Sequence, residues 1–502
     1  MSVEEIEEIY NFVGGAFTKS SSNDFLDVHA PASGELIARV NVSNMSDVTT
    51  AVLAAQSAQV EWASLTNMKR SKIMFKFREL VERDTDELSA LIVQEHGKNF
   101  AEARAEVAKG NETVEWACGM PSLMAGRRTE VSKGVVCYDV REPLGVVVSI
   151  VPFNFPFMVP MWTVPIALAA GNCVILKPSE KVPLTMNKTA KLMAEAGVPP
   201  GVFQIIHGTK DAVNGLCDAP GLRAVTFVGS SLVAELVAKR CRANGKRVLA
   251  MGGAKNHLVA LEDCDTNGAA KDIVASFAGC AGQRCMAASV LVLVGECKDL
   301  MAKVVEHASA LQKGQEKGQM GPIIDAASKA RILGYINGAV ERGAKCLVDG
   351  RSWAKDTPGH WVGPTVLFFD SVDDPCLREE IFGPVLSVVR VDTWQKAVDI
   401  ENSSPFGNAA SIYTSVGAHA EWFTPRFAAG MIGVNIGVPV PREPFSFGGH
   451  ANSVSKFGDF DVTGDGAMEF FTNRRKVTTK WTKIDRPTEG DCTDHANFAG
   501  QM

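Results

Sequence analysis

The sequence has no paired cysteines and no metal-ligand pattern. Its 12 cysteines are scattered over 502 residues, none forms a Cys-x-x-Cys pair, and no Cys/His group has metal-ligand spacing. This argues against structural zinc and a disulfide scaffold, and we predict no bound metal. Scattered thiols are typical of a reducing compartment, and the acidic N-terminus does not resemble a targeting peptide. We predict a cytoplasmic location, or a mitochondrial one if the sequence is that of a mature form.

Basic clusters and membrane spans are also lacking. The net charge is −6, and the longest basic stretch is Arg474-Arg475-Lys476, which argues against a nucleic-acid surface. The uncharged run 143–176 is long enough to cross a membrane, but four prolines and the polar residues Asn154 and Asn172 interrupt it. We interpret it as strand, loop, helix and strand. We therefore expect no nucleic-acid or membrane partner.

Short apolar runs alternate with helical patterns along most of the chain. Strands are expected at 145–151, 173–176, 202–206, 224–228 and 247–249, and a second set at 288–294, 365–369, 385–391 and 431–435. Helical patterns occupy 158–170, 184–196, 231–243, 300–311 and 326–342. This alternation predicts two α/β units with parallel sheets, the first of the doubly wound, dinucleotide-binding type. The polar segment 485–502 is expected to be a flexible tail.

Cys285 is the first candidate for chemistry. It stands in the run GQRCM among small residues that allow close backbone approach, and Arg284 would favour the reactive thiolate. A thiolate can attack an aldehyde carbon, and the resulting thiohemiacetal can release a hydride to an oxidised nicotinamide. The alternative is a small buried side chain. Asn154, in the run PFNFP, is either a turn residue or an amide donor to the oxyanion that this attack creates.

Two sequence runs that follow expected strands indicate cofactor binding. Lys177-Pro178-Ser179-Glu180 follows a strand, where ligands bind in open α/β sheets, and its charged residues could hold ribose hydroxyls. The carboxylate of Glu180 would repel a 2′-phosphate and so favour NAD. The run FVGSS leads into a helix whose N-terminus could bind phosphate, unless Ser230 is only an N-cap. No GxGxxG fingerprint follows any expected strand.

Together these motifs resemble the aldehyde dehydrogenase superfamily. PFNFP, KPSE, FVGSS, GQRCM and the run EIFGP at 380–384 occur in that family's order and spacing over about residues 10–482. The resemblance implies an α/β fold with a Rossmann-like NAD-binding domain (8–123 and 143–256), a catalytic domain (257–445) and a small β oligomerisation arm (124–142 and 446–484). It also implies a homodimer or homotetramer. It makes Cys285 the nucleophile and Asn154 the oxyanion donor, and the implied NAD-binding residues are Val151, Phe153, Lys177, Glu180, Lys181, Ser230, Gly252, Glu380 and Phe382.

Met251 indicates one branch of this family. Most members carry Glu-Leu-Gly-Gly-Lys, whose Glu activates water for release of the acyl group, whereas this chain has the run MGGAK at 251–255. Methionine cannot take a proton, and a positioned base contributes ~10²–10⁴-fold, so a thiol such as coenzyme A is the better acyl acceptor. The runs GAKNH (253–257) and GVNIGVPVPREPFSFGG (433–449) resemble methylmalonate-semialdehyde dehydrogenase. That family is CoA-dependent and converts malonate or methylmalonate semialdehyde, with decarboxylation, to acetyl-CoA or propionyl-CoA.

The resemblance assigns the substrate carboxylate to two cations. Arg284 offers a bidentate fork, unless it is a surface or interface ion-pair arginine. The family's second arginine aligns with Lys109, which keeps the charge but loses the fork and so leaves the preferred semialdehyde open. Two alternatives stand beside this reading: a hydrolytic dehydrogenase with another base, such as Glu380, and a non-catalytic structural relative.

Overall fold

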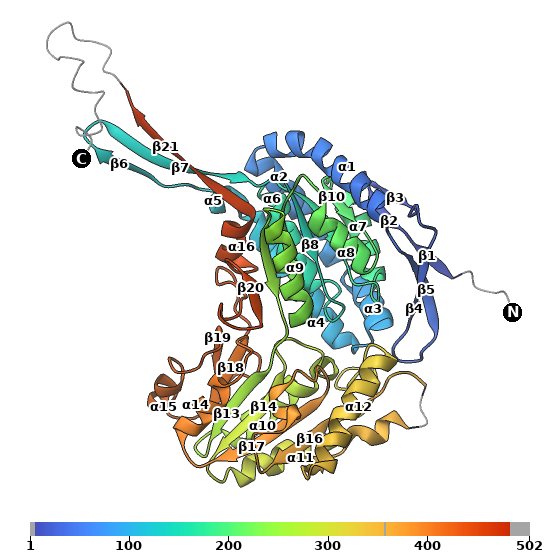
Figure 1. The fold of residues 1–502 in the computed structure, drawn as a ribbon, viewed down its shortest axis with the longest axis vertical. Coiled ribbons are helices and arrows are strands. Elements are labelled where there is room, and N and C mark those ends of the chain that lie inside the picture. Colours follow the sequence, from blue (N-terminus) through green and yellow to red (C-terminus); the bar gives the residue numbers. More distant parts are fainter. Residues whose placement is uncertain (1–5, 356–357, 482–502) are drawn as a thin grey trace, which may run out of the picture.

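Two α/β lobes and a projecting arm make up the protein. The structure is a computed structural model that describes residues 6–355 and 358–481, so the predicted tail at 485–502 lies outside the described residues. In Figure 1 the upper lobe holds one large sheet, the lower lobe holds the other, and strands β6, β7 and β21 extend from the upper lobe as the arm. The predicted α/β fold with two sheet units and a β arm is confirmed.

An eight-stranded sheet forms the upper lobe. Its order is β20-β12-β11-β8-β9-β10-β2-β3, parallel from β12 to β10 and antiparallel at both edges. The strands are β2 (Asn11–Val13), β3 (Ala16–Thr18), β8 (Val146–Ile150), β9 (Cys173–Lys177), β10 (Phe203–Ile205), β11 (Leu222–Val228), β12 (Arg247–Met251) and β20 (Lys456–Gly458). Every residue of β8 and β9 is buried, as expected for parallel strands in the middle of a covered sheet.

Helices of the upper lobe pack against this sheet or against the helices that cover it. They are α1 (Met45–Ser64), α2 (Asn67–Arg83), α3 (Thr85–His96), α4 (Phe100–Cys118), α5 (Met120–Leu123), α6 (Met158–Ala169), α7 (Leu184–Glu195), α8 (Lys210–Asp218), α9 (Ser231–Ala243) and α16 (Gly464–Phe471). The uncharged run 143–176 becomes β8, α6 and β9, which confirms the strand, helix and strand interpretation. No helix of the described residues is long and apolar enough to cross a membrane.

A seven-stranded sheet forms the lower lobe, in the order β15-β16-β17-β14-β13-β18-β19, and only β15 runs antiparallel to its neighbour. Its strands are β13 (Asn256–Leu261), β14 (Ala288–Val294), β15 (Lys345–Val348), β16 (Thr365–Phe369), β17 (Val385–Val391), β18 (Ala409–Tyr413) and β19 (Met431–Val434). Its helices are α10 (Thr266–Ala278), α11 (Lys298–Ala310), α12 (Ala326–Glu341), α13 (Pro375–Arg378), α14 (Trp394–Asn402) and α15 (Gly417–Phe423), with 3-10 turns η1 (Gly279–Gly282) and η2 (Gly350–Ala354).

Two three-stranded sheets complete the fold. One has the order β1 (Glu7–Ile9), β5 (Leu36–Asn41) and β4 (Phe25–His29); the arm has the order β21 (Thr472–Lys480), β7 (Val135–Pro143) and β6 (Arg128–Ser132). The predicted arm segment 446–484 also contains β20, which pairs with β12 in the upper lobe. The domain boundaries stay predictions, while the chain passes from one large sheet to the other between Met251 and Asn256.

Candidate active site

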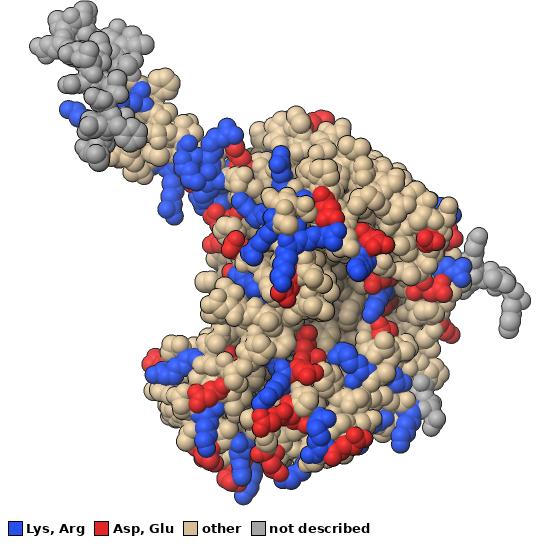
Figure 2. All heavy atoms as spheres, in the orientation of Figure 1, with Lys and Arg blue, Asp and Glu red and all other residues tan. Residues whose placement is uncertain are grey.

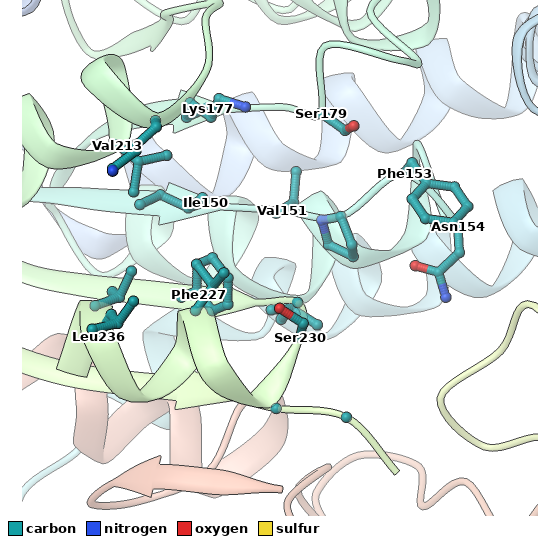
Figure 3. Close-up of a pocket in the computed structure, with 18 of the residues that line it drawn as sticks. Ile150, Val151, Phe153, Asn154, Lys177, Ser179, Val213, Phe227, Ser230 and Leu236 are labelled. Carbon is teal, nitrogen blue, oxygen red and sulfur yellow. The ribbon is translucent and has the colours of Figure 1, made fainter. Parts of the chain in front are cut away.

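A cavity of about 1240 Å³ lies where the two lobes meet. This volume exceeds the ~300–1,000 Å³ of ordinary small-molecule pockets and suits a long ligand. Figure 3 shows its two ends: Ile150, Val213 and Leu236 gather at one end, and Phe153 and Asn154 lie at the other.

The cavity brings together the predicted catalytic and cofactor-binding residues. Its lining includes Val151, Phe153, Asn154, Lys177, Glu180, Lys181, Ser230, Gly252, Cys285, Glu380 and Phe382. Arg284 lines a small adjoining cavity together with Cys285, whereas Lys109 lines neither cavity. The structure therefore places all these residues except the two substrate cations around one space, and their individual roles stay predictions.

Cys285 sits just after the tight turn η1. Gly282 adopts φ +69°, and a Cβ atom there would lie 2.1 Å from the carbonyl oxygen of Gly383, so only glycine fits. The carbonyl oxygen of Cys285 accepts hydrogen bonds from the Nδ2 atoms of Asn256 at 2.8 Å and Asn408 at 2.9 Å. These bonds fix the backbone that carries the thiol.

Burial raises the pKa of the Cys285 thiol to about 12, and the negative charge of Glu380 adds to this effect. The backbone N–H groups of Cys285 and Met286, and last the charge of Arg284, act in the opposite direction. Arg284 thus favours the thiolate, as expected, but its charge is the smallest of these effects. Its guanidinium is paired with Glu102 at 3.0 Å, and burial of the sulfur outweighs its charge.

Asn154 is buried and points toward the segment of the nucleophile. Its Nδ2 donates to the carbonyl oxygen of Gln283 at 3.0 Å, two residues before Cys285. The backbone carbonyl oxygen of Asn154 accepts a hydrogen bond from Lys98 Nζ at 2.8 Å. One hydrogen bond therefore fixes the backbone of Asn154 and another orients its side-chain amide, and a fixed donor is what an oxyanion site requires.

Sequence reasoning missed the ion pair that supports this loop. The side chains of Lys98 and Glu106 are fully buried, with Nζ and Oε2 2.5 Å apart. Glu106 Oε1 accepts hydrogen bonds from the backbone N–H groups of Phe157 at 2.8 Å and Met158 at 3.2 Å, at the start of α6. The signal available in the sequence is that Glu106 falls on the apolar face of α4.

The ribose candidates form two ion pairs. Lys177 Nζ and Glu180 Oε2 are 3.0 Å apart. Burial works to raise the pKa of Glu180, but the charge of Lys177 and hydrogen bonds outweigh it and hold the pKa below the ordinary value. Lys181 pairs with Asp325 at 2.5 Å and lies 5.4 Å from the ring centre of Phe153. Glu180 is thus an ionised acceptor that faces the cavity.

The N-terminus of α9 offers a phosphate site. Ser230 is the N-cap, yet its side chain makes no capping hydrogen bond, so the hydroxyl and the first helical N–H groups can bind a ligand. Lys210, Lys239 and Arg240 also line the cavity, and Figure 2 shows Lys and Arg side chains gathered on this face of the upper lobe. The apolar end of the cavity at Ile150, Val213 and Leu236, called the apolar slot below, fits a dinucleotide such as NAD together with the ionised Glu180 and the helix N-terminus.

Glu380 lies near Cys285, at the opposite end of the cavity from the apolar slot. Its Oε1 accepts a hydrogen bond from the N–H of Ala254 at 2.8 Å, and a Cβ atom at Gly253 would lie 2.3 Å from its Oε2. Burial raises the pKa of Glu380. Phe382 contacts Phe153 edge to face, with ring centres 6.0 Å apart. These groups close the end of the cavity that contains the nucleophile.

Both candidate substrate cations already have carboxylate partners. Arg284 is paired with Glu102 at 3.0 Å, as the ion-pair alternative expected. Lys109 Nζ lies 2.8 Å from Glu112 and 3.8 Å from Glu443. A substrate carboxylate would have to exchange with these partners. Among the described residues, no group of three or more His, Cys, Asp or Glu side chains is placed to hold a metal ion.

Comparison with known proteins decides the family. The sequence model of the aldehyde dehydrogenase family matches residues 17–477. The chain belongs to the aldehyde dehydrogenase family. The predicted resemblance is thereby confirmed, and with it the class of NAD-dependent oxidoreductases.

Within this family, the chain is similar to proteins named as semialdehyde dehydrogenases. A malonate-semialdehyde dehydrogenase of Geobacillus kaustophilus is 42% identical over 482 residues, which cover 95% of this chain and 99% of the relative. The structure of methylmalonate-semialdehyde dehydrogenase from Oceanimonas doudoroffii superposes with a TM-score of 0.92 at 38% identity, covering 95% of this chain and 99% of that one. A Sinorhizobium meliloti structure complexed with NAD gives a TM-score of 0.93 at 36% identity with the same coverage.

Proposed function

We propose that this aldehyde dehydrogenase oxidises malonate or methylmalonate semialdehyde with NAD and transfers the decarboxylated acyl group from Cys285 to coenzyme A. The names of its relatives support the semialdehyde. The apolar slot, the ionised Glu180 and the N-terminus of α9 support the dinucleotide.

The proposal that coenzyme A, and not water, accepts the acyl group rests on Met251. It ends β12 and is only 3% exposed, and it occupies the place where most family members carry the glutamate that activates water. The described carboxylates that line the main cavity are Glu180 and Glu380. Glu180 is paired with Lys177, so the thioester of Cys285 lacks the usual base for water.

The first half of the reaction uses Cys285 and Asn154. The sulfur of Cys285 bonds to the aldehyde carbon, and the carbonyl oxygen becomes an oxyanion that Asn154 Nδ2 stabilises in exchange for its bond to Gln283. NAD, when bound, supplies the hydride acceptor. The carbonyl then re-forms as a thioester on Cys285.

The second half releases the acyl group. The substrate carboxylate stands beta to the thioester carbonyl, so loss of CO₂ leaves an enolate that the thioester and Asn154 stabilise. A proton from solvent then adds to the α-carbon and gives the acyl thioester. The thiolate of coenzyme A then bonds to the acyl carbon, and Cys285 leaves as a thiolate. Arg284, beside the nucleophile, is the cation we assign to the substrate carboxylate, with Glu102 as the partner that it exchanges.

The test is an NADH-formation assay with malonate semialdehyde and NAD, with and without coenzyme A, and with the product identified. Multiple turnovers only with coenzyme A, yielding acetyl-CoA, are expected. A free acid as the dominant product in the presence of coenzyme A would instead support the hydrolytic alternative, with Glu380 as its base.

We also propose that the arm pairs this chain with a second copy. Val131 and Val140 are exposed on the arm. At the open edge of the lower sheet, Ile432 and Val434 of β19 are exposed beside a groove of about 660 Å³. An open apolar edge strand usually finds a covering strand, and the arm of another copy could supply it.

A further inference from the structure

The side-chain nitrogen of Lys255 is buried and has no hydrogen-bond partner among the described residues. Lys255 lies in the short segment between Met251, where β12 ends, and Asn256, where β13 begins. A buried ammonium without a partner is costly, so such a group calls for a role or a bound molecule. The reaction steps proposed above give it neither.

A small enclosed cavity of about 10 Å³ adjoins the main one. Lys255, Cys285 and Glu380 all line it, and Glu380 and Cys285 line the main cavity as well. A space of ~10–15 Å³ accommodates one water molecule. The lysine and the two groups that face the substrate therefore border one small cavity.

We propose that Lys255 accepts the proton of the incoming thiol, acting through one water in this small cavity and through Glu380, and so serves a thiol where Met251 cannot serve water. This proposal rests on the proposed function, in which a thiol releases the acyl group. Lys255 does not touch the reacting atoms and acts through Glu380.

In the proposed step every proton and electron pair is accounted for. The S–H bond of the thiol breaks, and its proton passes through Glu380 and the water to the free amine of Lys255. The thiol sulfur bonds to the acyl carbon, and the bond from that carbon to Cys285 Sγ breaks with its electron pair on sulfur. The ammonium of Lys255 then returns the proton to that thiolate, and nothing is oxidised or reduced.

The charges around Lys255 suit this exchange. Burial lowers the pKa of Lys255 to about 8, and the surrounding Cys376, Glu380, Glu379 and Asp374 only partly oppose burial. His257 faces it as well, but burial lowers the pKa of His257 to about 3, so it carries no charge at neutral pH. Since a free thiol has a pKa of ~8.5, transfer to this amine is nearly balanced, whereas water is far too weak an acid to donate.

The test measures discharge of acyl-Cys285 by an added thiol. Cys285 is acylated with p-nitrophenyl acetate without cofactor, and its turnover by β-mercaptoethanol is followed from about pH 7 to about pH 10 in wild type, Lys255→Met and Lys255→Arg. At about pH 7 the rate of acyl-enzyme turnover by the thiol should fall at least tenfold in both variants, since a positioned base contributes ~10²–10⁴-fold. At about pH 10 their turnover rates should approach the wild-type rate, because the thiol then ionises without a base.

Equal loss at every pH would assign Lys255 a structural role, and wild-type turnover of Lys255→Arg at low pH would assign it a purely electrostatic one; either overturns the proposal. An unchanged p-nitrophenol burst verifies that the Cys285 site is intact. Lys246→Met is the matched control, because Lys246 is buried but donates to backbone carbonyls far from Cys285. Because the assay adds its own thiol, it remains decisive even if the physiological acceptor is water.

Discussion

Burial and the carboxylate of Glu380 both raise the pKa of Cys285, to about 12. Thiolate is the reactive form of cysteine, so the free enzyme should react slowly with alkylating agents at neutral pH.

Replacing Glu380 by Gln tests this at the residue scale. Loss of the negative charge lowers the pKa of Cys285, so more thiolate exists at a given pH and the rate of iodoacetamide alkylation at about pH 8 should rise severalfold. Mass spectrometry of the Cys285 peptide measures it. Glu379→Gln is the control, since Glu379 is exposed and bonds to Tyr335. An unchanged or slower rate for Glu380→Gln would contradict the electrostatic account.

Glu180→Gln tests the choice of cofactor. The ionised carboxylate accepts hydrogen bonds from ribose hydroxyls and repels a 2′-phosphate. Its removal should therefore weaken the binding of NAD and allow NADP to bind. We expect the ratio of kcat/KM for NADP to that for NAD to rise about tenfold, which is about 1.4 kcal/mol. Glu195→Gln, which alters a surface pair with Arg83, should leave the ratio unchanged. A constant ratio for Glu180→Gln would place cofactor selection elsewhere.

At the element scale, the buried Lys98–Glu106 pair joins α4 to the Asn154 loop and to the start of α6. Lys98→Met leaves Glu106 buried without its counter-charge, which typically costs ~3–5 kcal/mol. Denaturant unfolding should show this loss, and Lys98→Met/Glu106→Gln should recover part of it, because the stranded charge is gone. If the double variant lost the sum of both single losses, the two residues would not act as a pair.

Local patterns predicted the elements that carry the motifs. The expected strands at 145–151 and 173–176 and the helix at 231–243 match β8, β9 and α9 to within a residue or so, because continuous apolar runs and an N-capping serine mark them. The edge strand β20 was not predicted, since its three residues are only half buried and show no alternation.

The partners of the site residues were beyond sequence reasoning. Glu102, which binds Arg284, lies 182 residues away in the chain, and Glu443, near Lys109, lies on a distant loop. Folding brings these charges together through long-range packing that no local motif records. For the same reason the net state of the Cys285 thiol does not follow from Arg284 alone: the sequence shows the cation but neither its carboxylate partner nor the burial of the sulfur.

At the scale of the whole molecule, the lobes enclose the reaction and the arm offers a contact surface. Val140→Asp on the arm and Ile432→Asp on β19 place a charge on each proposed half of the contact. Light scattering after gel filtration should show that either variant shifts the assembly toward monomer. Val60→Asp is the matched control, because Val60 is 77% exposed on α1. A wild-type protein that is monomeric, or variants that keep its assembly, would contradict the arm proposal.

In the proposed reaction the acyl group stays on Cys285 until a thiol removes it, because Met251 cannot activate water. Intact-mass spectrometry of the enzyme after mixing with malonate semialdehyde and NAD, before and after addition of coenzyme A, tests it most directly. The account predicts that an acyl adduct on Cys285 accumulates and persists without coenzyme A and disappears as acetyl-CoA forms once it is added. An enzyme that turns over repeatedly without coenzyme A and never accumulates the adduct would contradict it.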